Sequence, residues 1–117
     1  MKRLLIQRQR ALRSLPPLEE IVRGSVFARR VRCGKPSCHC AGTPGHPATY
    51  LSVTFAGGRT EQISLPAALV PVARRWVANY RKWWSAVEKV SALNRQILRR
   101  QRAAAVAAGR NKPRKKR

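Results

Sequence analysis

The sequence predicts an α+β fold, in which a small three-stranded antiparallel sheet is preceded by short N-terminal helices and followed by a long C-terminal helix. Three observations predict it: a β-branched segment at 25–32, a hairpin pattern across 49–65, and an apolar seam of helical period that begins near residue 69. At 117 residues the chain should form one modest core, which excludes a large multi-domain enzyme.

The N-terminal segment 1–15 is basic and carries leucines at roughly helical spacing, which predicts a first helix that ends at the prolines that follow. The leucines are Leu4, Leu5, Leu12 and Leu15. A second short helix is expected to begin at Pro17, because proline suits the first helical position and Glu19 and Glu20 favour the first turn. Gly24 would stop this helix.

Two strands are expected on either side of the cysteine-bearing segment. The segment 25–32 contains the β-branched and aromatic residues typical of a strand and leads directly to Cys33. After the cysteines, the segment 49–55 alternates between apolar and polar residues. This alternation predicts a half-buried strand.

A glycine pair after that strand turns the chain into a third strand at 59–65. A two-residue turn at the glycines would place apolar residues opposite polar ones. A three-residue loop, 56–58, instead matches the apolar faces and places Gly58 in a left-handed bulge conformation, so we predict the longer loop. The predicted pairs are Leu51 with Ile63 and Thr49 with Leu65.

A long helix is predicted to begin at about Ala67 and to run past Ile97. Alternating steps of four and three residues trace an apolar seam of period 3.5, as in paired helices. The seam consists of Leu69, Ala73, Trp76, Tyr80, Trp83, Val87, Val90, Asn94 and Ile97. Its aromatic half should pack on the sheet, whereas the segment 87–97 should pair with another helix, either residues 1–15 or a second copy in a homodimer. Asn94 is the type of residue that fixes the register of such a pair.

The most specific local pattern is a cysteine cluster with the spacing C-x4-C-x-C-x5-H. Its members are Cys33, Cys38, Cys40 and His46. Zinc takes four nitrogen or sulfur ligands, and three cysteines with one histidine are a common structural set. Because four such ligands leave no position for a catalytic water, the pattern predicts a structural Zn²⁺ in this loop.

Three other interpretations of the cysteine segment stay open. His39 lies between two of the cysteines and is the alternative fourth ligand, although adjacent side chains diverge on a tight loop, which favours His46. A catalytic cysteine paired with a histidine is disfavoured, because no acidic residue lies nearby to orient that histidine. Cysteines that bind no metal are the remaining alternative.

The charge balance is the strongest functional signal. The chain has 26 Lys+Arg against 4 Asp+Glu, a formal net charge of +22 at pH 7. Without Asp, it has almost no material for paired-carboxylate hydrolysis or carboxylate-held metal ions, so no enzymatic activity is expected. Positive side chains at this density repel one another, and binding to a polyanion reduces that repulsion. Nucleic acid, either DNA or RNA, is therefore the expected partner.

No membrane segment is expected, because no run of about 18 apolar residues occurs. Arginines after Ile6 interrupt the start of the chain before a signal-peptide core can form. We therefore expect a cytoplasmic protein, nucleoid-associated or free. In a reducing compartment, clustered cysteines favour a metal site over disulfides.

The basic residues form three groups that are predicted to contact phosphates. The group at the mouth of the cysteine loop is Arg29, Arg30, Arg32 and Lys35. The group on the first turns of the long helix is Arg74, Arg75, Arg81 and Lys82. The C-terminal group is Arg99, Arg100, Arg102, Arg110, Lys112, Arg114, Lys115, Lys116 and Arg117. Trp84, which lies off the seam, is a candidate for stacking on an exposed base.

Composition divides the chain into three regions. Residues 1–24 form a basic N-terminal helical extension, 25–98 contain the zinc-loop hairpin and the long helix, and 99–117 form a basic tail. From Gly109 on, the tail is a like-charged block that cannot bury apolar area, so it should be disordered when free.

The segment from about residue 30 to 98 resembles a family of short, functionally uncharacterised bacterial proteins that are often encoded near transposases and other mobile-element genes. The resemblance rests on Arg32-Cys33-Gly34-Lys35-Pro36-x-Cys38-x-Cys40, the loop to His46, Tyr50-Leu51, Leu65-Pro66, Trp76 to Arg81 and Leu93-Asn94. Pro47-Ala48-Thr49 departs from the polar aromatic strand that is usual in the family. The resemblance implies a zinc-bearing accessory protein of a mobile element and leaves the basic ends, 1–15 and 99–117, outside the family's pattern.

Three functions are compatible with the sequence. The first is a small zinc-stabilised nucleic-acid-binding accessory protein, a subunit of a mobile-element or RNA-guided complex that contains a larger enzyme. The second is a protein-interaction adaptor whose long helix recruits an enzyme and whose basic ends give non-specific avidity. The third, a metal-dependent nuclease, is disfavoured by the shortage of acidic residues.

Overall fold

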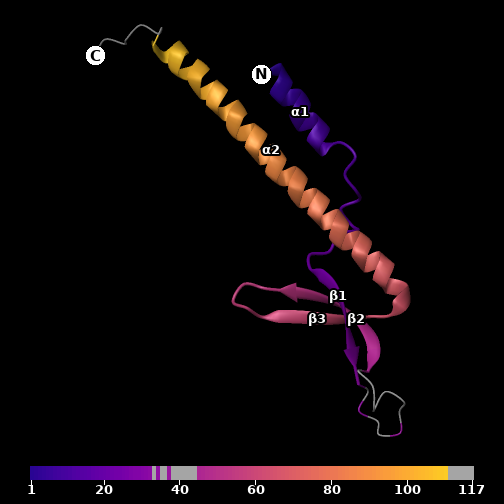
Figure 1. Cartoon of the computed structure of the whole chain (residues 1–117). Coiled ribbons are helices and arrows are strands. Elements are labelled where there is room, and N and C mark those ends of the chain that lie inside the picture. Colours follow the sequence, from indigo (N-terminus) through magenta and orange to yellow (C-terminus); the bar gives the residue numbers. More distant parts are fainter. Residues whose placement is uncertain (33, 35–36, 38–44, 111–117) are drawn as a thin grey trace. The chain divides into compact units, whose positions relative to one another are not determined.

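The computed structural model describes residues 1–32, 34, 37 and 45–110 (Figure 1). It has the predicted α+β class, with a three-stranded antiparallel sheet, a short N-terminal helix and a long C-terminal helix. The chain divides into two compact units. One combines Met1–Leu15 with Trp83–Arg117, and the other is Pro16–Lys82. Each unit is described separately below.

The sheet has the strand order β1-β2-β3, with β1 at Ser25–Val31, β2 at His46–Thr54 and β3 at Thr60–Leu65. Between β2 and β3 the predicted register is confirmed, since Leu51 lies opposite Ile63 and Thr49 opposite Leu65.

The predicted three-residue hairpin loop is also confirmed. The Phe55 N–H donates to the Arg59 carbonyl over 2.7 Å, which leaves residues 56–58 in the loop. Gly58 has φ 85°, in the left-handed region that the bulge requires. The loop therefore matches the apolar faces of β2 and β3, as the alternation of the sequence demands.

The core of the Pro16–Lys82 unit lies between one face of the sheet and the first turns of α2, which spans Val70–Arg110 after a 3₁₀ turn at Ala67–Leu69. Leu51 on the central strand and Ala73 and Val77 on α2 are all buried. Val26 of β1 lines a shallow depression together with residues of α2. Apolar burial on this one face fixes which side of the sheet meets the helix.

The second short helix predicted from Pro17 is wrong. The structure has a single turn there, closed by the Glu20 N–H and the Pro17 carbonyl. The segment then runs along α2, where the Val22 N–H donates to the Trp76 carbonyl over 3.1 Å and Asn79 Nδ2 donates to the Glu20 carbonyl over 2.9 Å. The Val22 N–H and the Glu20 carbonyl, which would pair within a short helix, thus form hydrogen bonds with α2 instead.

In the unit that combines residues 1–15 with the second half of α2, helix α1 at Lys2–Leu12 packs against α2. Leu4 of α1 and Leu93 and Ile97 of α2 form a buried apolar cluster. Of the two partners that the sequence left open for this part of the long helix, the structure shows the N-terminal segment of the same chain.

The buried stripe of α2 departs from the predicted seam. Ala86 and Leu93 are 8% and 6% exposed, whereas Val87, a predicted seam residue, is 50% exposed. Both buried residues lie one position before the seam residues Val87 and Asn94, whereas Ile97 is buried as the seam predicts. Contact with α1 selects this face of the helix, since Leu93 and Ile97 form a cluster with Leu4.

Helix α2 runs through the boundary that composition placed at residue 98. Residues 99–110 are helical, and the helix continues through Gly109, where the sequence predicted the start of a disordered block. Predicted tail residues up to Arg110 therefore belong to the helix. Within the described part of the chain, no helix is both long and apolar enough to span a membrane.

Candidate nucleic-acid interface

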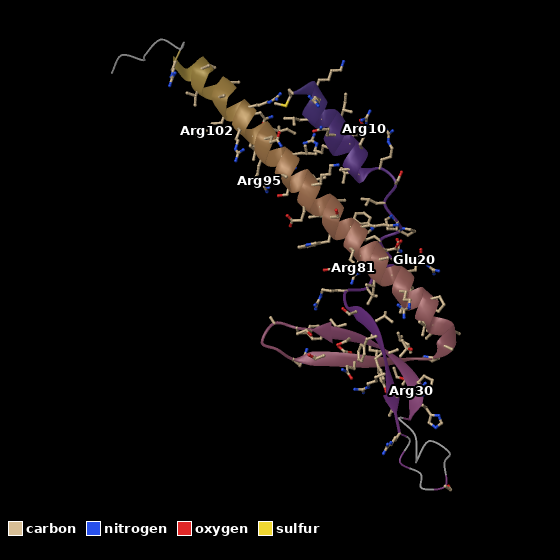
Figure 2. All side chains as sticks on the ribbon, viewed as in Figure 1. Arg10, Glu20, Arg30, Arg81, Arg95 and Arg102 are labelled. Atoms are coloured by element: carbon tan, nitrogen blue, oxygen red, sulfur yellow. The ribbon has the colours of Figure 1, made fainter. Side chains whose placement is uncertain are left out.

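Close backbone packing holds together the end of the sheet that carries the cysteine segment. Val31, the last residue of β1, pairs with His46, the first residue of β2. Gly45 is buried with φ 110°, and a Cβ at this position would lie 2.6 Å from the carbonyl carbon of Val31. Arg30 Nη1 donates to the Gly45 carbonyl over 2.9 Å, at the sheet end where Figure 2 labels Arg30. Only glycine fits here, because a side chain would clash with β1.

The predicted zinc ligands fall largely outside the described residues. Cys33, Cys38, Cys40 and the alternative ligand His39 all do so. His46 is described, and it belongs to strand β2, opposite Val31 at the end of the strand that leads to Cys33. Within the described ranges, no group of three or more His, Cys, Asp or Glu residues could hold a metal ion. The zinc site therefore stays a prediction.

The arginines predicted to cluster at the mouth of the loop do not form one group. Arg29, Arg30 and Arg32 are all exposed at the end of β1. Arg29 and Arg30 are consecutive strand residues, so their side chains leave opposite faces of the sheet. Arg30 reaches back to Gly45, whereas Arg29 lies over the ring of Tyr50. Lys35, the fourth member, lies outside the described residues.

The basic residues on the first half of α2 are exposed, as predicted. They are Arg74, Arg75, Arg81 and Lys82. Arg74 and Arg81, seven positions apart, line the same depression beside Val26 and Val77. Residues seven apart share one helix face, so this pair offers two guanidinium groups along one edge of the unit.

The described part of the predicted C-terminal group lies along α2. Arg99, Arg100, Arg102 and Arg110 are all exposed. Arg99, Arg102 and Arg110 border a shallow groove of about 380 Å³ that alanines and Val106 complete. Figure 2 labels Arg102 on this stretch. The remaining members of the group lie outside the described residues; they are Lys112, Arg114, Lys115, Lys116 and Arg117.

An aromatic pair that the sequence pattern did not reveal lies on the sheet face opposite Leu51. Phe27 of β1 is paired with Tyr50 of β2, and their rings stack with centroids 5.7 Å apart and an interplanar angle of 25°. The guanidinium carbon of Arg29 lies 4.5 Å from the centroid of the Tyr50 ring. These three residues, here named the aromatic patch, combine two aromatic rings with one positive charge.

A second arginine–aromatic cluster lies where β2 meets its hairpin loop. The guanidinium carbons of Arg23 and Arg59 lie 5.3 and 4.9 Å from the centroid of the Phe55 ring. Arg23 Nη1 also donates to the Thr54 carbonyl over 2.8 Å. Two cations already contact this one ring, so the cluster stabilises the hairpin and presents its charge outward.

The aromatic patch can be predicted from the sequence only if the register between β1 and β2 is known. The β1–β2 pairing joins strands separated by the cysteine segment, so no short turn fixes which residues face each other. A regular hairpin with Val31 opposite His46 would have placed Phe27 beside Tyr50. The expectation that β2 begins near residue 49 hid this pairing.

A family model described as a domain of unknown function (DUF6788) matches residues 1–75. The match includes α1, the cysteine segment, the sheet and the first turns of α2. The match begins at residue 1 and so includes the basic segment 1–15. No curated protein and no solved structure matches the chain.

Proposed function

Because the chain belongs to the family described as a domain of unknown function (DUF6788), which brings no activity with it, we propose from its own residues that it is a basic nucleic-acid-binding accessory protein without enzymatic activity. The observation that carries this proposal is the charge: +22 with 4 acidic residues in 117. Such an imbalance has no stabilising role in the folded monomer, whereas phosphates neutralise it and release counterions.

The placement of the basic side chains supports the same proposal. Exposed arginines lie on the sheet end, on the first half of α2 and along its last turns, so both units offer positive charge. In the sheet unit, Arg74 and Arg81 share one helix face. In the helical unit, Arg99 and Arg102 border one groove. Contacts of this kind set affinity and salt dependence rather than sequence preference.

We further propose that Cys33, Cys38, Cys40 and His46 hold a structural Zn²⁺. The close packing of Gly45 against Val31 supports this, because it holds His46 at the base of the loop in a fixed position on β2. Three thiolates and one imidazole match the ligand preference of zinc. The ion would order a segment that has glycines and prolines but little apolar material for a core.

The proposed setting is a cytoplasmic or nucleoid-associated complex that contains a larger mobile-element or RNA-guided enzyme. The chain's shortage of acidic residues supports an accessory role, because two-metal and paired-carboxylate chemistry would have to come from a partner. The resemblance around the cysteine motif supports the mobile-element context.

Titration of the full-length protein with labelled duplex DNA, single-stranded DNA and structured RNA at several salt concentrations tests the proposal. We expect binding to at least one of them at about 150 mM salt, with log K falling linearly against log salt. Binding to none of the three would refute the proposal and favour the adaptor.

The adaptor is the second candidate because one groove in the helical unit is mainly apolar. It measures about 420 Å³ and is lined by Leu12, Val87, Val90, Ser91, Asn94, Arg95 and Leu98. Leu12, Val87 and Leu98 are 54%, 50% and 62% exposed. This groove is where a second copy would form the predicted homodimer through 87–97, or where a partner's helix would bind. Sedimentation of the full chain distinguishes a dimer from a monomer.

A further inference from the structure

We infer that the aromatic patch of Phe27, Tyr50 and Arg29 binds an unpaired base, so that the nucleic acid recognised by the sheet is single-stranded. This inference rests on the proposed function and specifies its substrate. It follows from the side of the sheet on which the patch lies, from the chemistry of its three side chains, and from the residues around it.

The patch lies on the face of the sheet that does not carry the core. Side chains alternate along a strand, so Tyr50 points away from the face that carries the buried Leu51. Val26, next to Phe27 on β1, lines the depression against α2. Phe27 and Tyr50 are partly exposed, while Leu51 is 5% exposed. The two rings therefore lie on the face opposite the contact with the helix.

The neighbours of the patch on this face are polar, so no aliphatic layer covers the two rings. Ser64 of β3 lies opposite Tyr50, and the next row of the sheet consists of Ser25, Ser52 and Gln62. A sheet face that covered another apolar layer would carry aliphatic side chains at these positions. Hydroxyl and amide groups instead offer hydrogen bonds to the edges of a base or to a sugar.

The patch supplies the two kinds of contact that a single strand needs. Aromatic rings on a sheet stack with unpaired bases, and each base presents a π face regardless of its identity. The Tyr50 ring already contacts Phe27 and Arg29, so a base would stack on the Phe27 face turned away from Tyr50, or take the place of the Arg29 guanidinium over Tyr50. The displaced guanidinium could then pair with the phosphate of that nucleotide. Bases in a duplex already stack on one another, so the rings cannot reach their faces.

Charge complementarity favours a nucleic acid over an apolar ligand or a protein at this face. Arg29 and Arg32 are exposed at the end of β1, and the acidic residue of the sheet, Glu61, pairs with Val53 and so lies on the other face. A strand laid across Phe27 and Tyr50 would therefore meet positive charge and no carboxylate from β1, β2 or β3.

Fluorescence anisotropy with the full-length protein at about 150 mM salt tests the inference. The probes are an unstructured oligouridine, an oligothymidine of the same length and a DNA duplex. Replacing Tyr50→Leu or Phe27→Leu should weaken binding to the single strands by roughly tenfold to a hundredfold, because stacking contributes about 1–3 kcal/mol per base. Duplex binding, which depends on phosphates, should change by less than about twofold. The ratio between the two single strands shows whether RNA or DNA is preferred.

Two variants separate stacking from charge. Tyr50→Phe keeps the ring and should restore single-strand affinity. Arg29→Gln should lower the slope of log K against log salt by about 0.7 if its charge contacts one phosphate, whereas Tyr50→Leu should leave the slope unchanged. Phe55→Leu is the matched control, because that ring also contacts arginines but lies at the hairpin. Its effect on single-strand preference should be negligible.

Cross-linking of the wild-type protein provides a measurement that does not depend on the folding of variants. Oligouridine that carries a photoreactive 4-thiouridine should cross-link to peptides containing Phe27 or Tyr50. The inference is wrong if single strands bind but cross-link only to α2 peptides. It is also wrong if a folded Tyr50→Leu variant loses single-strand and duplex binding equally. In both cases the proposed function stands. If no nucleic acid binds, the proposed function itself fails.

Discussion

Arg8 of α1 donates a hydrogen bond from Nη1 to the Oδ1 atom of Asn94 on α2, over 2.9 Å and in a partly buried position. The bond lies beside the cluster of Leu4, Leu93 and Ile97 that joins the two helices. The sequence predicted that Asn94 would fix the register of a helix pair. In the structure its side-chain oxygen accepts this bond from α1 of the same chain. A charged donor makes this bond stronger than a neutral one.

A double-mutant cycle on this pair should give a coupling energy of about 1 kcal/mol. Asn94→Leu alone leaves the Arg8 guanidinium without this acceptor, so we expect the free energy of unfolding to fall. Combining it with Arg8→Met should recover most of the loss, because an apolar pair extends the neighbouring cluster. Urea denaturation of the four proteins measures the coupling. Additive effects of the two substitutions would show that α1 does not hold this position in solution.

Asn79 plays the corresponding role in the other unit, where it is 7% exposed and donates to the Glu20 carbonyl. Replacing Asn79→Ala should cost about 1–3 kcal/mol, because a partly buried carbonyl loses its donor and the segment after Pro17 loses an attachment to α2. Chemical denaturation gives the change. Ala78→Ser is a suitable control, since residue 78 is exposed on the same helix turn and should shift stability by less than about 0.5 kcal/mol. Equal effects of both variants would contradict the assigned role.

Local signals predicted the parts of the fold that are close in sequence. The three-residue hairpin followed from matching Leu51 with Ile63, because a one-residue change of register would have moved every apolar side chain to the wrong face. The α+β class and the long helix followed from equally local periodicities.

Features that depend on distant contacts were not predictable in this way. The segment 17–24 has good local helix signals, yet α2 supplies competing hydrogen bonds to Glu20 and Val22 that no local pattern shows. The buried stripe of α2 includes Ala86 and Leu93 in place of Val87 and Asn94, because contact with Leu4 of α1, a distant part of the chain, selects the buried face. Distance along the chain also explains the missed aromatic patch, since Phe27 and Tyr50 meet only after β1 and β2 pair across the cysteine segment.

Gly45→Ala should destabilise the protein more than the φ angle alone explains. Both Gly45, at φ 110°, and Gly57, at φ 89°, have backbone angles that cost a side-chain residue about 1–3 kcal/mol. A Cβ at Gly45 would also lie 2.6 Å from Val31, whereas nothing lies within 4 Å of one at Gly57. Thermal unfolding should therefore show a larger drop for Gly45→Ala than for the control Gly57→Ala. Similar drops for the two variants would mean that the sheet end can open without cost.

Elemental analysis of protein purified without chelator should find about one zinc per chain, as expected for a closed four-ligand site. Cys40→Ser should lower the ratio of zinc to protein and the melting temperature together, because metal binding and local folding are coupled. His46→Ala and His39→Ala decide between the two candidate ligands, since only loss of the true ligand should weaken zinc retention during dialysis against a competing chelator. Substoichiometric zinc in the wild-type protein would refute the site.

The C-terminal basic residues should contribute affinity for duplex DNA through phosphate contacts. Because α2 is helical to Arg110, a deletion of 111–117 leaves the helix intact while it removes Lys112, Arg114, Lys115, Lys116 and Arg117. If about half of these charges contact phosphates, the slope of log K against log salt should fall by roughly 2. Replacing Arg99 and Arg102 with Gln tests the helical part of the group separately, and replacing Glu88 with Gln is the control that removes a negative charge from the same helix. Any sequence preference should survive the deletion, because phosphate contacts carry none. An unchanged slope would assign the last residues to solubility and confine nucleic-acid contacts to the rest of the chain.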